Sequence, residues 1–240
     1  DDTIDGSDIN EAGVANVQTV GATDSIDGGA GTDTMTFEYS VDTTPLSISN
    51  VEIIKITDTD ATANVEAINL VNVTGMTHLH VIGNTNEANI DNMAAIAEVS
   101  LINTTGGANL DYAAAAVAGT ADTQTVNVQS TTAGTLTVDA GIETLALNSN
   151  GGQANTLAAV SGSMTKVTIA GSAALTVTGA IGTAVTTVDG SAATGALTLT
   201  QTGAQISNVT TGSGNDTIDL SGNFVDGTTA ASADTVAAGA

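Results

Sequence analysis

The chain is dominated by short runs in which apolar residues alternate with Thr, Ser or Asn. One theme recurs at residues 51–56, 65–70 and 142–147, and a weaker copy lies at residues 97–101. In the three full copies, apolar residues stand at relative positions i, i+3 and i+5, which predicts a bend followed by a strand of two-residue period. We therefore expect short β-strands, each with one buried and one exposed face.

Towards the C-terminal half these runs become regular. Apolar runs lie at residues 167–169, 175–177, 185–188, 197–199 and 206–209, with glycine between successive runs. Their spacing of about ten residues, with pairs about twenty apart, is typical of a two-sided solenoid of about 20 residues per coil. The predicted fold class is all-β, a parallel β-solenoid or β-roll.

Three segments depart from this alternation. Residues 87–98 and 154–164 place apolar side chains at helical spacing, and residues 112–118 are rich in Ala. We expect short helices or capping loops on the flank of the solenoid at these places. A uniformly β structure is the alternative.

Composition narrows the class of protein. Aromatic residues make up 2% of the chain, so small and β-branched side chains must fill the core, which suits narrow stacked coils. Two Lys stand against 26 acidic residues, giving a formal net charge of −24. Such a chain repels nucleic acid and anionic lipid and attracts cations. No apolar run reaches the roughly 20 residues of a membrane span, and the absence of Cys leaves stabilisation to other means, such as metal.

Glycine-rich nonapeptides lie near both ends of the chain. Residues 28–36 read G-G-A-G-T-D-T-M-T, and residues 19–27 form a degenerate tandem copy, T-V-G-A-T-D-S-I-D. Residues 211–219 read T-G-S-G-N-D-T-I-D, and partial copies lie at residues 1–6 and 234–240. Glycine allows tight turns that direct carbonyl oxygens inward. An Asp carboxylate together with carbonyl oxygens is the ligand set that Ca²⁺ prefers.

These repeats resemble the nonapeptides of RTX proteins, which wind into a parallel β-roll with calcium between stacked turns. The resemblance implies Ca²⁺ as cofactor, export by type I secretion, and metal ligands in both nonapeptide regions, with exposed acidic turns as the alternative. The expected carboxylate ligands are Asp2, Asp24, Asp33, Asp216 and Asp234. The expected main-chain carbonyl ligands are Gly28, Ala30, Gly212 and Ser213.

The spacing of the aspartates suggests how the coils stack. Asp2 and Asp24 stand slightly more than one β-roll coil of about 18 residues apart. They are expected on one side of the coils, with a bulged loop taking up the surplus and with Asp33 on the opposite side. Asp216 and Asp234 are separated by one such coil.

Both ends of the chain fall inside a repeat, so we expect a fragment of a longer array. It divides into an RTX-like segment (1–45), a solenoid with degenerate repeats (46–210) and a second RTX-like segment (211–240).

The mixture of nonapeptides with Thr-, Ala- and Gly-rich runs also resembles the surface-layer (S-layer) proteins of Caulobacter-type bacteria. That resemblance implies a secreted structural protein of the bacterial cell surface that self-assembles into a calcium-dependent lattice. Further copies of the chain are the expected partner, with cell-surface polysaccharide bound through regions outside it, and neither nucleic acid nor membrane insertion is expected. The alternatives are the extender of an RTX adhesin and the RTX portion of a secreted enzyme.

The chain itself is not expected to be an enzyme. His78 and His80 are its only histidines and lie on one face of a predicted strand, where an unliganded, exposed position is favoured over a zinc or copper site. No nucleophile motif with an adjacent base is present, and a sugar-cleaving site would want aromatic platforms that the chain lacks.

Overall fold

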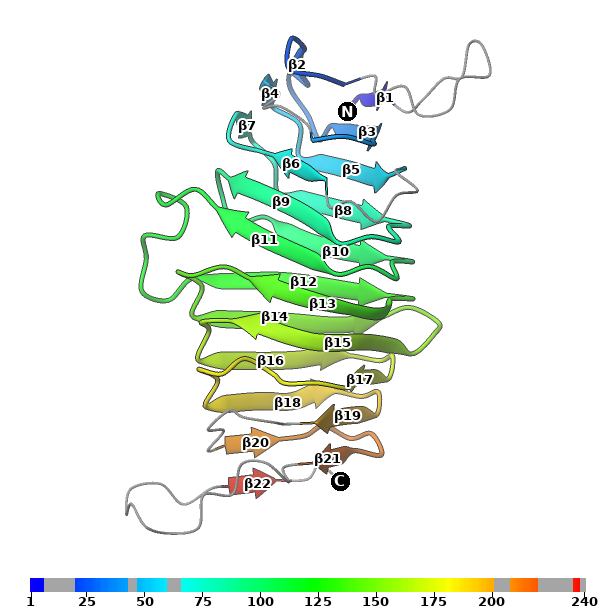
Figure 1. Cartoon of the computed structure of the whole chain (residues 1–240), viewed down its shortest axis with the longest axis vertical. Helices are drawn as coiled ribbons and strands as arrows, with labels where there is room; N and C mark the ends of the chain where they lie inside the picture. Colours follow the sequence, from blue (N-terminus) through cyan, green and yellow to red (C-terminus); the bar gives the residue numbers. More distant parts are fainter. Residues whose placement is uncertain (7–19, 43–46, 60–65, 201–207, 220–234, 238–240) are drawn as a thin grey trace.

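A computed structural model describes residues 1–6, 20–42, 47–59, 66–200, 208–219 and 235–237, and these residues form a parallel β-solenoid. The strands stack along the longest axis, with residues 1–6 and residues 235–237 at opposite ends of the stack (Figure 1). Every strand pair in the described chain is parallel, because each coil returns the chain to the same side before the next strand begins. The predicted fold class is confirmed.

The largest sheet has eleven described strands and runs the whole length of the stack. Its strands are β1 (Thr3–Gly6), β3 (Thr34–Tyr39), β5 (Ile53–Asp58), β8 (His78–Ile82), β10 (Glu98–Ile102), β12 (Thr123–Gln129), β14 (Thr144–Asn150), β16 (Lys166–Gly171), β18 (Thr187–Ala193), β20 (Asn208–Thr210) and β22 (Thr235–Ala237). We call it the long sheet.

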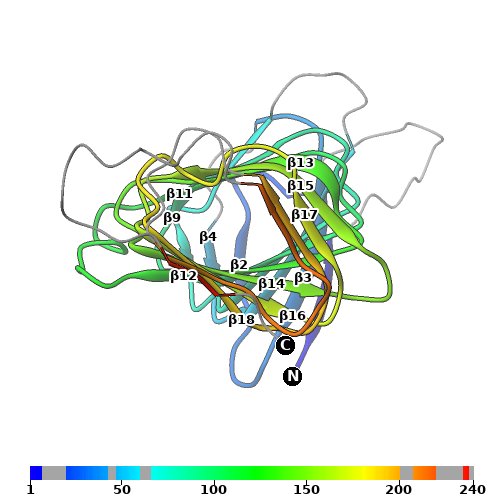
Figure 2. The same ribbon diagram turned by 90° about the horizontal axis from the view of Figure 1, so that it is seen from below.

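Two further sheets cover the other sides of the common interior (Figure 2). The eight-stranded sheet contains β6 (Ala67–Asn69), β9 (Ala88–Met93), β11 (Ala108–Tyr112), β13 (Thr132–Val138), β15 (Asn155–Gly162), β17 (Leu175–Val177), β19 (Leu197–Thr200) and β21 (Thr217–Asp219). The three-stranded sheet, near the N-terminal end, contains β2 (Ser25–Asp27), β4 (Ser47–Ser49) and β7 (Val73–Thr74).

Coil length follows from the strand register. Thr123 pairs with Thr144, Thr144 pairs with Lys166, and Lys166 pairs with Thr187, so successive coils in the middle of the chain are nearly equal in length. These pairs confirm the predicted period of about 20 residues per coil in this part of the solenoid. The first coil is longer, because Thr3 pairs with Thr34.

The core consists of columns of aliphatic side chains. On the long sheet one column runs through Met35, Ile54, Leu79, Val99 and Val126, each aligned with the next and fully buried. Burying such a side chain contributes about 1.5–3 kcal/mol. Stacking of aliphatic residues at equivalent positions fills a narrow interior, which explains how the chain folds with so few aromatic residues.

The expected flanking helices are not present in the described residues, and the uniformly β alternative is correct. Residues 87–98 and 154–164 contain β9 and β15, and residues 113–116 form a turn. The strand pairing shifts register in both strands, which indicates a β-bulge in each. Across a bulge, two side chains that stand three residues apart, instead of two, both point into the core. Ile90 and Met93 are therefore both buried although they stand at helical spacing. No helix of the described chain could cross a membrane.

Candidate functional site

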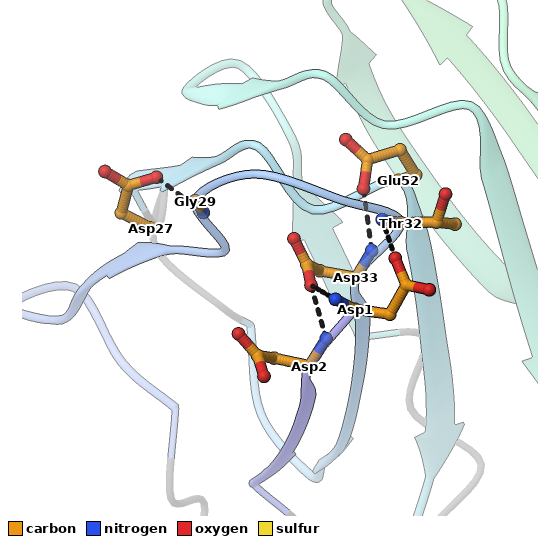
Figure 3. A network of polar contacts seen from close by, with 7 residues as sticks. All are labelled: Asp1, Asp2, Asp27, Gly29, Thr32, Asp33 and Glu52. Carbon is orange, nitrogen blue, oxygen red and sulfur yellow. Dashed lines mark hydrogen bonds and ion pairs between the residues drawn. The ribbon is translucent and has the colours of Figure 1, made fainter.

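The complete nonapeptide forms a tight turn, residues 28–33, between β2 and β3 (Figure 3). Gly29 has a φ of 83°, a left-handed conformation that favours glycine. The turn lies between two neighbours from other coils. Thr32 N donates to Asp1 Oδ1 at 2.6 Å on one side, and Gly28 N donates to Ser49 O at 3.0 Å on the other. The motif therefore stacks against neighbouring coils, as the nonapeptide pattern predicts.

Asp33 ends this turn and is completely buried. Its Oδ1 accepts a hydrogen bond of 2.5 Å from Asp2 N. Its Oδ2 is buried and has no hydrogen-bond partner. An oxygen of a buried carboxylate without a partner carries a large desolvation cost, which a bound cation would offset.

The other predicted N-terminal ligands are distributed around the turn. Asp2 is exposed and lies opposite Asp33, since Thr3 pairs with Thr34. The expected stacking of Asp2 on Asp24 is therefore wrong. Asp24 precedes β2 in the three-stranded sheet, and its Oδ2 accepts from Gly21 N at 2.8 Å within a local turn. The first coil is longer than a regular β-roll coil, which moves Asp33 rather than Asp24 into register with Asp2.

The donor set around Asp33 is chemically suited to calcium. Asp1 and Asp2 bring further carboxylates to the same turn (Figure 3), and the main chain of Gly28 and Ala30 would supply carbonyl oxygens by motif. Among the described residues, no three acidic, His or Cys side chains converge closely enough to hold a metal by themselves. Calcium at this turn would accordingly need carbonyl oxygens, which is the ligand mixture that it accepts.

The C-terminal nonapeptide forms a comparable turn at residues 211–216, before β21. Gly212 is buried, and Ser213 is exposed and donates its N–H to Ala193 O at 3.1 Å. Asp216 is half-buried, and its Oδ1 accepts from Leu197 N at 2.8 Å. Asp234 lies outside the described residues. The strand after Asp234, β22, belongs to the long sheet, whereas the strand after Asp216, β21, belongs to the eight-stranded sheet. The separation of one β-roll coil therefore does not stack β22 on β21.

One hydrogen bond recurs where a carboxylate directly precedes a strand of the long sheet. Asp33 Oδ1 accepts from Asp2 N, and Glu52 Oε2 accepts from Asp33 N at 2.8 Å. In a middle coil, Glu143 Oε2 accepts from Asp122 N at 2.7 Å. In each case the donor is the residue opposite on the preceding coil. Glu52 and Glu143 both belong to the motif that recurs along the sequence, but the motif alone predicted no role for them. Their shared position directly before a strand is the sequence signal that could have identified them.

The outer face of the long sheet carries all four basic side chains of the protein. Lys55 on β5 pairs with His80 on β8, and His78 is bonded to Thr77 Oγ1 through Nδ1 at 2.9 Å. Burial and the neighbouring Lys55 lower the pKa of His80. Both histidines lie on the predicted outward face. Glu98 lies opposite His78 on β10, but no three such side chains of the described residues are placed so that they could hold a metal.

Comparison with known proteins adds no relative: no family model matches the chain, and neither a curated protein nor a solved structure matches it significantly. The resemblances to RTX and S-layer proteins stay predictions.

Proposed function

We propose that this chain is a structural protein of the bacterial cell surface, a lattice subunit of the S-layer type whose folding and assembly depend on calcium. The observation that carries the proposal is the buried carboxylate of Asp33, with its Oδ2 lacking a hydrogen-bond partner. This residue is the acidic position of the best-matching nonapeptide in the sequence. A divalent cation would offset the desolvation of that oxygen.

Each nonapeptide turn would supply two kinds of ligand. The carboxylates of Asp33 and Asp216 would contact the cation, while the glycines of each turn let main-chain carbonyls approach it. With a formal net charge of −24, the chain repels itself when calcium is scarce, which favours an extended form during type I export. Outside the cell, calcium would neutralise the carboxylates and stabilise the closed coils. Further copies of the chain, and cell-surface polysaccharide through regions beyond it, are the proposed partners.

A second candidate is the extender of a secreted adhesin. The long sheet continues without interruption through eleven described strands (Figure 1), and such an elongated stack suits a stiff tether. The two functions share the calcium chemistry and differ in lateral self-association, which a lattice requires and a tether avoids.

Calcium binding is tested by titration calorimetry and urea unfolding of the wild type, Asp33→Asn and Asp216→Asn. A site with calcium at about 100 times its Kd stabilises the fold by about 2.7 kcal/mol. Asn keeps an oxygen that accepts the hydrogen bond but lacks the charge, so each variant should lose part of this gain. Asp122→Asn, outside the nonapeptides, is the matched control. Wild-type stabilisation in both nonapeptide variants would overturn the proposed calcium sites.

Assembly is tested by electron microscopy in millimolar calcium and in chelator. Ordered sheets that appear only with calcium would support the lattice subunit. Dispersed folded rods in calcium would favour the extender. Equally folded, equally dispersed samples in both conditions would contradict calcium dependence itself.

A further inference from the structure

Glu52 contacts the proposed calcium site from outside the nonapeptide. It precedes β5, one coil after Asp33, and its Oε2 accepts the Asp33 N–H at 2.8 Å (Figure 3). Ile53 N donates to Asp33 O at 3.0 Å, so both main-chain polar groups of Asp33 are held by consecutive residues of the next coil. Glu52 is itself anchored, because its carbonyl accepts from Thr77 N and His78 N at 2.9 Å.

These contacts determine which atom of Asp33 is left without a partner. Its N–H and its C=O are bonded to the coil after it, and Oδ1 is bonded to Asp2 N in the coil before it. Oδ2 is the remaining polar atom, and it is buried without a hydrogen bond. A ligand oxygen oriented in advance loses less freedom on binding, and partners that orient ligands typically affect metal affinity about 10–100-fold.

The chain contains a natural comparison for this arrangement. Glu143 precedes β14, and its Oε2 accepts from Asp122 N at 2.7 Å, the same bond between the same positions of consecutive coils. Asp122 differs from Asp33 because it is half-exposed and its Oδ2 accepts from Gly119 N at 2.9 Å. The shared bond therefore links coils at both places, but of the two aspartates only Asp33 has a buried carboxylate oxygen without a partner.

We propose that Glu52 is a positioning residue of the calcium site. Its carboxylate holds the main chain of Asp33, so that Asp33 Oδ2 keeps the orientation in which it meets the cation. This inference rests on the proposed function, since it concerns the same site, and adds a residue that the nonapeptide does not contain.

The test compares Glu52→Ala, Glu52→Gln, Glu143→Ala and Asp33→Asn by calcium titration and by unfolding in chelator. Loss of the bond should lower stability in chelator for both alanine variants. Only Glu52→Ala should also weaken calcium binding, by about tenfold. Glu52→Gln, which retains an acceptor oxygen, should restore most of the affinity. A purely structural role would lower stability without this selective change in affinity.

The outcomes separate the inference from the proposed function. Calcium binding by the wild type, lost in Asp33→Asn but unchanged in Glu52→Ala, would overturn the role of Glu52 alone. Equal damage in Glu52→Ala and Glu52→Gln would also overturn it, because charge rather than the hydrogen bond would then be required. If the wild type binds no calcium, or Asp33→Asn binds it normally, the proposed function fails at this site.

Discussion

Gly28 and Asn50 approach each other so closely that a Cβ built on Gly28 would lie 1.9 Å from the Asn50 carbonyl oxygen. The same relationship exists at the other nonapeptide, where a Cβ on Gly212 would lie 1.8 Å from Ala193 O. Both contacts are with main-chain atoms of an adjacent coil. Gly28 and Gly212 are therefore required by the stacking of turns, whether or not calcium is bound.

Gly28→Ala should lower the free energy of unfolding by about 1–3 kcal/mol, because main-chain atoms must move to admit the new methyl group. Gly21→Ala is the control: a Cβ at Gly21 would meet no atom within 4 Å, and its effect should stay within about 0.5 kcal/mol. Urea unfolding in chelator measures both. Equal stabilities of the two variants would contradict the stacking argument.

Asn155 links three parts of the solenoid through its buried side chain. Its Oδ1 accepts from Thr131 N at 3.0 Å, and its Nδ2 donates to Ser149 Oγ at 2.9 Å and Val128 O at 3.1 Å. Asn155→Ala should cost about 2–4 kcal/mol, because several buried polar groups lose their partner together. Asn148→Ala, on the outer face of β14, should cost less than about 1 kcal/mol. Thermal and urea unfolding provide the comparison, and similar losses in both variants would refute it.

The strand pattern was readable from the sequence because a solenoid repeats one local rule. Ile54 and Ile56 alternate with polar residues and are buried as predicted. The helix prediction at residues 87–98 was wrong for a local reason: Asn92, with a φ of 55°, lies in a β-bulge that brings Ile90 and Met93 to the same side. An i, i+3 spacing in a strand with a bulge is indistinguishable from a helical one in sequence alone.

The sequence was sufficient to predict individual residues of the candidate site, but not which of them lie opposite one another on consecutive coils. The nonapeptide pointed to Asp33, which the structure buries. Which aspartate would stack on Asp2 depended on the length of the first coil, and a fixed β-roll period gave the wrong partner. The role of Glu52 was not predicted, because its contact with Asp33 depends on the register between two consecutive coils whose sequences differ.

Asp111 should destabilise the folded protein at neutral pH. Burial, together with the hydrogen bond and charge of Asp139, raises the pKa of Asp111 above its ordinary value. The folded state therefore binds this proton more tightly than the unfolded state, and stability falls as pH rises above the unfolded value of about 3.9. Asp111→Asn should raise the melting temperature at pH about 7, and the gain should shrink as pH falls toward about 4. A gain that does not depend on pH would contradict this explanation.

The two tyrosines should ionise only when the protein unfolds in alkali. Burial raises the pKa of both Tyr39 and Tyr112 far above the usual value of about 10, and the carboxylates of Asp139 and Asp111 add to the shift at Tyr112. The folded state therefore keeps phenol protons that the unfolded chain releases, so the stabilisation is complete below pH about 10 and is lost as pH rises further. Tyrosinate absorbance and circular dichroism, followed through the same alkaline titration, should change together. Tyr39→Phe should halve the absorbance change, and a tyrosinate signal at the usual phenol pKa in protein that is still folded would show that at least one phenol is accessible.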